Sequence, residues 1–384
     1  MLATTILTAG DPVWPAKPLT IWTATDLHYL SPQLTDYGAL FTDVIMAGDA
    51  KITEYSPQIL DAFCSAVISR KPDALILTGD ITFNGELLSL QEASEKLAAV
   101  KKAGIPVLVL PGNHDINYYK AYRYSGDQAY NTKNISQEQF REICWEFGPS
   151  KAVMVDKNSF SYVYALTEDF WILTLDANTE AASGRIRSET LLWAEEQLRT
   201  AQKRGIVVLA ATHQNVLPQS KMMSFGYVIS NHKEVSALFR NYGVKWNLSG
   251  HVHMQHKAEE DGLADIATGS MAVAALRYGI VRLNEKRAFS YEMASVSEKQ
   301  EEAQERFHKK THAQVKKTLS GLNITEREAV LMTEFASDIN YRYFTGNLEK
   351  KYFSKHSEAW ALWQKHGADT FFGKYLRSMR EEFC

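Results

Sequence analysis

The chain has 384 residues, of which 45% are hydrophobic and 23% are charged, with a formal net charge of −3. This composition is typical of a soluble globular protein, and the slight negative charge argues against binding to nucleic acid polymers, which requires a basic face. Three cysteines are too few for a disulfide framework, and no apolar run reaches the roughly 18 residues of a membrane span.

The opening segment Met1–Ala9 lacks the cationic start and the apolar length of a signal peptide. Two localisations therefore remain as alternatives. One is the cytoplasm, and the other is export of a protein whose signal peptide is truncated in this sequence. Beyond this segment, apolar runs predict strands over 19–25, 74–77, 107–110, 171–175, 206–211 and 246–248. Continuous short runs of this kind suit strands that are buried on both faces.

Segments with helical spacing lie between these strands. They predict helices over 57–70, 88–103, 137–147, 188–203 and 233–241. Alternating strands and helices imply a layered α/β domain, in which ligands bind outside the carboxyl ends of the strands.

The character of the sequence changes near its C-terminal end. Residues 279–293 predict two strands around a turn at 284–287, and these strands close the main domain. Residues 297–317 are strongly charged, and the rest of the chain has helical spacing. We therefore expect two domains, residues 1–296 and a small all-helical region of residues 297–384, with the helices near the mouth of the site.

Polar residues follow the expected strands in five ordered clusters. They are Asp26-Leu27-His28, Gly79-Asp80, Gly112-Asn113-His114-Asp115, Thr212-His213 and Gly250-His251-Val252-His253. Together they bring imidazoles, carboxylates and an amide oxygen to one rim of a sheet, which is enough to hold two divalent metals. Because no thiolate is present, such a site favours Mn, Fe, Zn or Co. One His-x-His alone is more often a surface pair, but five ordered clusters reverse that preference.

The spacing of these residues suggests how each could bind. Asp80 follows a glycine at a strand end, so both of its carboxylate oxygens are free to bridge two ions. Asp26 and His28 are two residues apart and point the same way in an extended segment. His251 and His253 repeat that spacing, although the loop backbone could direct them to different ions.

His114 lies beside a predicted ligand and is free for another role. Two ions roughly 3.5–4 Å apart can lower the pKa of a shared water, and the resulting hydroxide would attack phosphorus in line. His114 would then protonate the leaving oxygen, and Asp115 would orient its ring.

The ordered set Asp-x-His, Gly-Asp, Gly-Asn-His-Asp, His and Gly-His-x-His resembles that of the calcineurin-like metallophosphoesterase superfamily, over residues 19–293. The resemblance implies a four-layer α/β/β/α sandwich of two mixed sheets, with His114 as the leaving-group acid. It also implies one metal on Asp26, His28, Asp80 and His253, and a second on Asp80, Asn113, His213 and His251. Within the superfamily, the chain is most similar to bacterial cyclic-nucleotide phosphodiesterase-like members with a C-terminal helical domain.

One departure from the superfamily concerns the partner of His114. Many relatives have a second Asp shortly after the Gly-Asp pair, whereas this chain reads Asp80-Ile81-Thr82-Phe83-Asn84-Gly85. The Asp-Arg-Gly pattern of protein serine/threonine phosphatases is absent, so that activity is disfavoured. Asn84 and Asp115 remain alternatives as the partner of His114.

The residues and the resemblance together predict a phosphoric diester hydrolase that uses two divalent ions, Mn, Fe or Zn, on a small-molecule phosphoester. The preference for cyclic nucleotides is implied by the resemblance alone. Two alternatives stay open, a phosphomonoesterase on nucleotides or phosphosugars and a non-catalytic scaffold of the same fold. Five tyrosines follow the Gly-Asn-His-Asp cluster, at 118, 119, 122, 124 and 130. They are a candidate wall for a nucleobase, although tyrosine-rich loops also simply pack. The oligomeric state is not predicted.

Overall fold

The structure, a computed structural model, describes residues 17–222, 226–285 and 288–382. Met1–Ala9, Cys384 and residues 286–287 of the predicted turn lie outside these ranges. Within them, none of the helices has the length and apolar character needed to cross a membrane.

The first sheet has five strands in the order β16-β15-β1-β2-β3. Their bounds are β1 Leu19–Ala24, β2 Ala74–Leu77, β3 Val107–Val109, β15 Arg277–Leu283 and β16 Phe289–Ser295. The strands β1, β2 and β3 run parallel, while β15 pairs antiparallel to β1, with Leu19 opposite Leu283. The sheet is therefore mixed, and the carboxyl ends of β1, β2 and β3 meet at one edge.

The second sheet has seven strands in the order β13-β14-β12-β11-β8-β7-β6. Their bounds are β6 Met154–Val155, β7 Tyr162–Thr167, β8 Phe170–Leu175, β11 Val207–Thr212, β12 Trp246–Ser249, β13 His256–Glu260 and β14 Leu263–Ala267. The run β8-β11-β12-β14 is parallel, and the strands at both ends of the sheet pair antiparallel.

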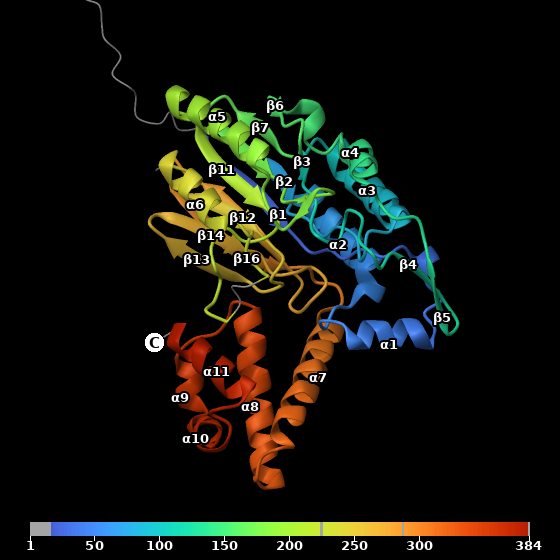
Figure 1. The fold of residues 1–384 in the computed structure, drawn as a ribbon, viewed down its shortest axis with the longest axis vertical. Helices are drawn as coiled ribbons and strands as arrows, with labels where there is room; N and C mark the ends of the chain where they lie inside the picture. Colours follow the sequence, from blue (N-terminus) through green and yellow to red (C-terminus); the bar gives the residue numbers. More distant parts are fainter. Residues whose placement is uncertain (1–16, 223–225, 286–287, 383–384) are drawn as a thin grey trace, which may run out of the picture.

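Helices cover the outer faces of both sheets (Figure 1). Helices α2 Ser56–Arg70, α3 Leu87–Lys102 and α4 Gln137–Cys144 lie on the first sheet, and α5 Ser188–Arg204 and α6 His232–Asn241 lie on the second. One buried apolar cluster joins the two sheets, with Ile76 of β2 and Leu209 of β11 among its members. The predicted α/β/β/α arrangement of two mixed sheets is confirmed.

Strands β6, β7 and β13 of the second sheet were not predicted from the sequence, and neither were several elements outside the two sheets. The latter include α1 Ala39–Ala47, the hairpin strands β4 Tyr122–Ser125 and β5 Gln128–Asn131, and the two-residue strands β9 Asn178–Thr179 and β10 Ala182–Ser183. Both α1 and the hairpin lie at the same end of the molecule, where Phe41 packs on Tyr124.

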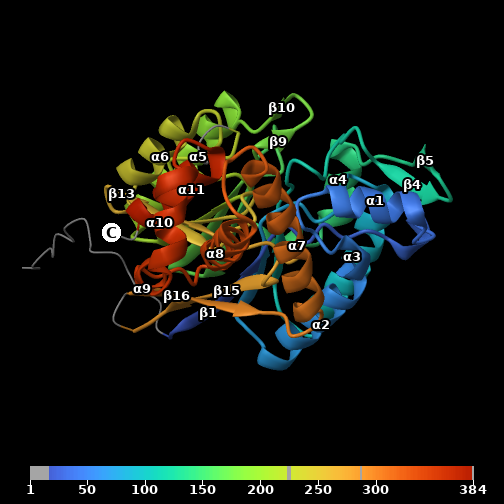
Figure 2. The ribbon, with the colours of Figure 1, turned by 90° about the horizontal axis from the view of Figure 1, so that it is seen from below.

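The C-terminal helices gather on one side of the sandwich (Figures 1 and 2). They are α7 Gln300–Leu319, α8 Glu326–Phe344, α9 Lys351–Lys355, α10 Ser357–His366 and α11 Phe371–Glu382. Helix α8 begins with a capping box in which Thr325 and Glu328 satisfy each other's backbone N–H groups. Its buried face shares an apolar cluster with Trp363 and with Val252 of the sandwich. The helical C-terminal region is confirmed, and the domain boundary at 296/297, between β16 and α7, stays a prediction.

Candidate metal centre

The ends of strands from both sheets bring all seven predicted ligands into one place. The ligand atoms of Asp26, His28, Asp80 and His253 all lie within 4.8 Å of one another, and those of Asp80, His213 and His251 form a second such group. Asn113 joins the second group, because its Oδ1 lies 3.1 Å from Nε2 of His213. Asp80 belongs to both groups.

The backbone at these positions is left-handed rather than extended. The φ angles are 50° at Asp26, 43° at His28, 50° at Asp80, 69° at His251 and 58° at His253. The expectation of an extended Asp-x-His segment is therefore wrong. A non-glycine residue in this region costs about 1–3 kcal/mol and is found most often at functional sites. These turns point the ligand side chains toward one another. If the strands continued straight, the same side chains would pass one another.

Two glycines allow the loops that follow β2 and β3 to meet. Gly79 has a φ of 95°, and a Cβ atom there would lie 2.6 Å from the backbone nitrogen of Gly112. A Cβ at Gly112 would lie 2.1 Å from Oδ1 of Asp80. A larger residue at Gly112 would therefore displace the Asp80 carboxylate, and one at Gly79 would push the loop of Gly112 and the His213 ring away.

The first group has an acceptor that the protein leaves unused. Oδ2 of Asp26 accepts a hydrogen bond from the backbone N–H of His251 at 2.9 Å, whereas its buried Oδ1 has no hydrogen-bond partner among the described residues. That oxygen lies 3.3 Å from Nε2 of His253, which in turn lies 3.1 Å from Nε2 of His28. Buried polar atoms are rarely left unpaired, so carboxylate and imidazole lone pairs facing one another fit a bound cation.

In the second group, hydrogen bonds to backbone carbonyl oxygens orient the two imidazole rings. Nδ1 of His213 lies 2.7 Å from a backbone carbonyl oxygen and donates to it, so Nε2 is left facing Oδ1 of Asp80 at 3.3 Å. In His251, Nε2 lies 3.0 Å from another carbonyl oxygen, which leaves Nδ1 free. Metal-binding histidines are held in this way by a hydrogen bond from the other ring nitrogen. Mixed nitrogen and oxygen donors without thiolate fit Mn, Fe or Zn.

The charges of the centre depend on burial and on pairing. Burial acts to raise the pKa of Asp80, but His213 and His114 outweigh it and hold that pKa well below its ordinary value. Burial acts to lower the pKa of His213, but the neighbouring Asp80 raises it to about 9. Burial lowers the pKa of His251 to about 4. Without a metal, His213 holds a proton that a bound cation would displace.

His114 lies at the edge of the first group, with its ring centroid 5.0 Å from that of His28. Its Nδ1 lies 2.9 Å from the carbonyl oxygen of Phe83 and 3.1 Å from Oδ1 of Asn84. Tyr118 stacks on the ring at 4.3 Å. Of the two alternative partners, the structure places Asn84 against the His114 ring.

Asp115 does not orient that ring, and the expectation that it would do so is wrong. Its carboxylate accepts the backbone N–H groups of Ile81 at 3.2 Å, Thr82 at 2.9 Å and Gly112 at 2.8 Å. Burial raises the pKa of this carboxyl to about 6, and Asp80 adds to the shift. Asp115 therefore ties together the loops that carry Asp80 and Asn113.

A cavity of about 560 Å³ opens over both groups. The sandwich contributes Asp49, Lys51, Asp80, Asn113, His114, His251 and His253 to its lining, and the C-terminal helices contribute Phe307, Lys310, Phe344, Phe371, Phe372 and Tyr375. The helices thus lie at the mouth of the site, as the sequence predicted. The sequence reading missed their aromatic side chains, although Phe371 and Tyr375 are four residues apart, which places them on one helix face.

The five tyrosines after the Gly-Asn-His-Asp cluster do not form the expected wall, because none of them lines this cavity. Tyr124 is buried against Phe41, and Tyr119 is 72% exposed. Apart from Tyr118 on the His114 ring, these residues belong to the packing of the β4–β5 end of the molecule or to its surface.

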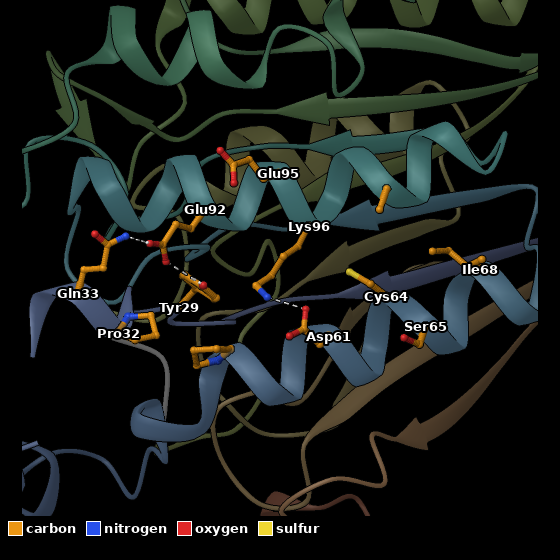
Figure 3. A pocket seen from close by; sticks show the side chains of 12 residues that line it. Tyr29, Pro32, Gln33, Asp61, Cys64, Ser65, Ile68, Glu92, Glu95 and Lys96 are labelled. Carbon is orange, nitrogen blue, oxygen red and sulfur yellow. Dashed lines mark hydrogen bonds and ion pairs between the residues drawn. The ribbon is translucent and has the colours of Figure 1, made fainter.

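A larger hollow of about 840 Å³ lies between α2 and α3 (Figure 3). Three of its charged side chains already have partners. Lys96 lies 2.6 Å from Asp61, and Glu92 accepts hydrogen bonds from Tyr29 and Gln33. By volume alone this hollow would be the candidate functional site, but the two ligand groups lie at the smaller cavity.

Clustered at the strand ends of a two-sheet sandwich, this donor set is that of a metal-dependent phosphoesterase. The sequence profile of calcineurin-like phosphoesterases matches residues 19–255. The chain therefore belongs to the calcineurin-like phosphoesterase family, whose members typically use two metals. A second profile, the C-terminal domain of cyclic nucleotide phosphodiesterase, matches residues 299–383.

Proteins that are similar to the chain include a bacterial sequence relative and a solved structure. The protein named "Probable glycerophosphodiester phosphodiesterase GpdQ" from Arcobacter nitrofigilis is 32% identical over 141 residues, which are 36% of this chain and 41% of that protein. The match thus spans less than half the length of this relative. A dimetal phosphatase from Danio rerio superposes with a TM-score of 0.52 and 14% identity, over 75% of this chain and 100% of its own. At that identity the likeness concerns the fold alone.

Proposed function

We propose that the chain is a dinuclear phosphodiesterase whose substrate class is cyclic nucleotides. The observation that carries this proposal is the position of Asp80, whose carboxylate belongs to both ligand groups. The name of the C-terminal profile and the phosphodiesterase name of the partial relative support the choice of a diester.

One ion would be held by Asp26, His28, Asp80 and His253, and the other by Asp80, Asn113, His213 and His251. When bound, two divalent ions, Mn, Fe or Zn, neutralise phosphate charge and lower the pKa of water. The chain itself fixes the donors through the left-handed turns and through the hydrogen bonds behind His213 and His251.

His114 is the proposed proton donor to the leaving oxygen. The carbonyl oxygen of Phe83 accepts from Nδ1, which fixes the ring and leaves Nε2 for the substrate. Burial lowers the pKa of His114 in the free protein, although Asp80 opposes that shift. A bound phosphate anion would favour the protonated ring in the same way as Asp80 does.

The aromatic side chains that line the cavity favour a substrate with a flat organic group. Phe371 is 64% exposed and stacks on Tyr375, with ring centroids 5.8 Å apart and an interplanar angle of 20°. Exposed aromatic faces beside a phosphate site are typical platforms for bases.

The test is hydrolysis by protein reconstituted with Mn. We expect bis(p-nitrophenyl) phosphate to be hydrolysed faster than p-nitrophenyl phosphate, and at least one 2′,3′- or 3′,5′-cyclic nucleotide to be hydrolysed. The Asp80→Ala variant should lose this activity, because it removes the shared ligand. Faster hydrolysis of the monoester would favour the phosphomonoesterase alternative. No turnover of any ester, with two metals bound, would favour the scaffold.

A further inference from the structure

Lys51 is a buried cation in the wall of the metal centre. The residue is 7% exposed and lines the same cavity as His114 and His253. In the part of the chain that the structure describes, the Asp49 carboxylate is its ion-pair partner, at 3.6 Å. That carboxylate is 78% exposed. Burying an ammonium group is costly unless it is well paired, and an exposed carboxylate at this distance compensates it weakly.

Helix α7 holds the segment that carries this lysine. Arg306 donates a hydrogen bond to the carbonyl oxygen of Lys51 at 3.0 Å and forms an ion pair with Glu54. Lys310, one turn later, donates to the carbonyl oxygen of Ala47 at 2.8 Å. On the other side, the backbone N–H of Ile52 donates to a carbonyl oxygen of the sandwich at 2.8 Å. The position of Lys51 is therefore fixed jointly by the sandwich and by the C-terminal helices.

We propose that Lys51 is a substrate-binding residue that donates to a non-bridging oxygen of the phosphoryl group. An ammonium group has three donors and no acceptor, and its hydrogen bonds to phosphate are charge-assisted. The candidate metal ligands lie in loops that follow the strands, whereas Lys51 adds positive charge from a separate segment between α1 and α2. The proposal rests on the proposed function, in that a phosphoryl group occupies the cavity.

This arrangement also gives helix α7 a role in substrate binding. Its side chains Arg306 and Lys310 hold the backbone of the segment that carries Lys51, so α7 positions the lysine in the cavity wall.

The test measures the binding of inorganic phosphate to the Mn-loaded full chain by calorimetry. We expect Lys51→Met to weaken phosphate binding about ten- to hundredfold, which is the range for a lost charge-assisted hydrogen bond. Lys51→Arg keeps the charge and should retain most of the affinity. Lys257→Met removes a lysine whose only ion-pair partner in the described ranges is Glu259, at 2.7 Å. As the matched control, it should bind phosphate like the wild type.

Metal content and thermal unfolding are measured on every variant. Wild-type affinity in Lys51→Met with both metals retained overturns the proposal, as does a wild type that binds no phosphate. Loss of metal or of folding in both Lys51→Met and Lys51→Gln also overturns it, because the ammonium would then be structural. Failure of the proposed function is a separate result. It would appear as absent diester turnover, whereas phosphate binding and its dependence on Lys51 would persist.

Discussion

The imidazole of His114 is held at Nδ1 and over one ring face. Its Nδ1 is engaged by Phe83 and Asn84, its face is covered by Tyr118, and among the described residues it belongs to neither ligand group. A ring fixed in this way can transfer a proton from Nε2 without rearranging the centre.

We expect His114→Asn to lower kcat for diesters with a poor leaving group by about 10²- to 10⁴-fold, which is the usual contribution of general acid catalysis. The loss should be smaller with a p-nitrophenyl ester, because p-nitrophenolate leaves without a proton. Metal content should not change. His312→Asn on α7 is the matched control and should keep wild-type rates. Equal losses for good and poor leaving groups would contradict the role as an acid.

Glu86 gives a pH dependence that is separate from the metal centre. Burial raises its pKa to about 8, against an ordinary value of 4.5. One carboxylate oxygen accepts the backbone N–H of Asn84 at 3.0 Å, and the other has no hydrogen-bond partner in the part of the chain that the structure describes. The folded protein therefore favours the neutral acid.

Because this pKa is higher in the folded chain than in the unfolded chain, its contribution to stability is fully present below pH 4.5 and is lost as the pH rises through about 8. We expect Glu86→Gln, which does not titrate, to flatten the fall in unfolding free energy across this interval. Urea unfolding at several pH values measures it, with the exposed Glu95→Gln as control. An unchanged slope in Glu86→Gln would show that the carboxyl is ionised when folded.

At the scale of elements, the strands and their polar ends were predictable because their cause is local. A short apolar run such as Ala74–Leu77 is recognised by its own composition, and it is β2 in the structure. The left-handed turns at Asp26 and His28 were not predictable, because the spacing of two residues equally fits an extended segment. The role of Asp115 was missed because its partners are backbone groups, which every sequence has.

The aromatic face of α11 was not predicted because it faces side chains far away in the sequence, such as His114, which lies 261 residues before Tyr375. Helical spacing places Phe371 and Tyr375 on one face, but only tertiary packing decides what that face meets. Lys51 was missed for the same reason. The segment around it has no periodic pattern, and α7 fixes its position from the far end of the chain.

Helix α11 is expected to contribute to substrate binding rather than to chemistry. Stacking of a base on an aromatic side chain is worth about 1–3 kcal/mol, so Phe371→Ser should raise KM for a cyclic nucleotide about 5- to 150-fold. The change in kcat should be much smaller. Val330→Ser on α8 replaces an apolar side chain that is 56% exposed and lines a different cavity. It is the control, and equal KM values in both variants would contradict the stacking role.

At the scale of the whole molecule, the centre lies between the two sheets, which also share a buried apolar cluster and several hydrogen bonds. Asp26, Asp80 and Asn113 follow strands of the first sheet, whereas His213 and His253 follow strands of the second. A cation bound by both sets connects the two sheets. Without it, the buried Asp26 carboxylate keeps an unpaired oxygen at the interface, so metal binding and stability are coupled.

We therefore expect chelation with EDTA to lower the thermal unfolding temperature and added Mn to restore it. At a free metal concentration about 100 times Kd, each site adds about 2.7 kcal/mol to the unfolding free energy. Asp80→Asn weakens the ligand common to both groups, so its unfolding temperature should depend much less on Mn. Burial acts to lower the pKa of His213, but Asp80 raises it to about 9. The proton on His213 competes with Mn for the ring, so the rise in unfolding temperature on adding Mn should become smaller as the pH falls. A wild-type unfolding temperature that ignores EDTA and Mn alike would show that the two sheets are held together without metal.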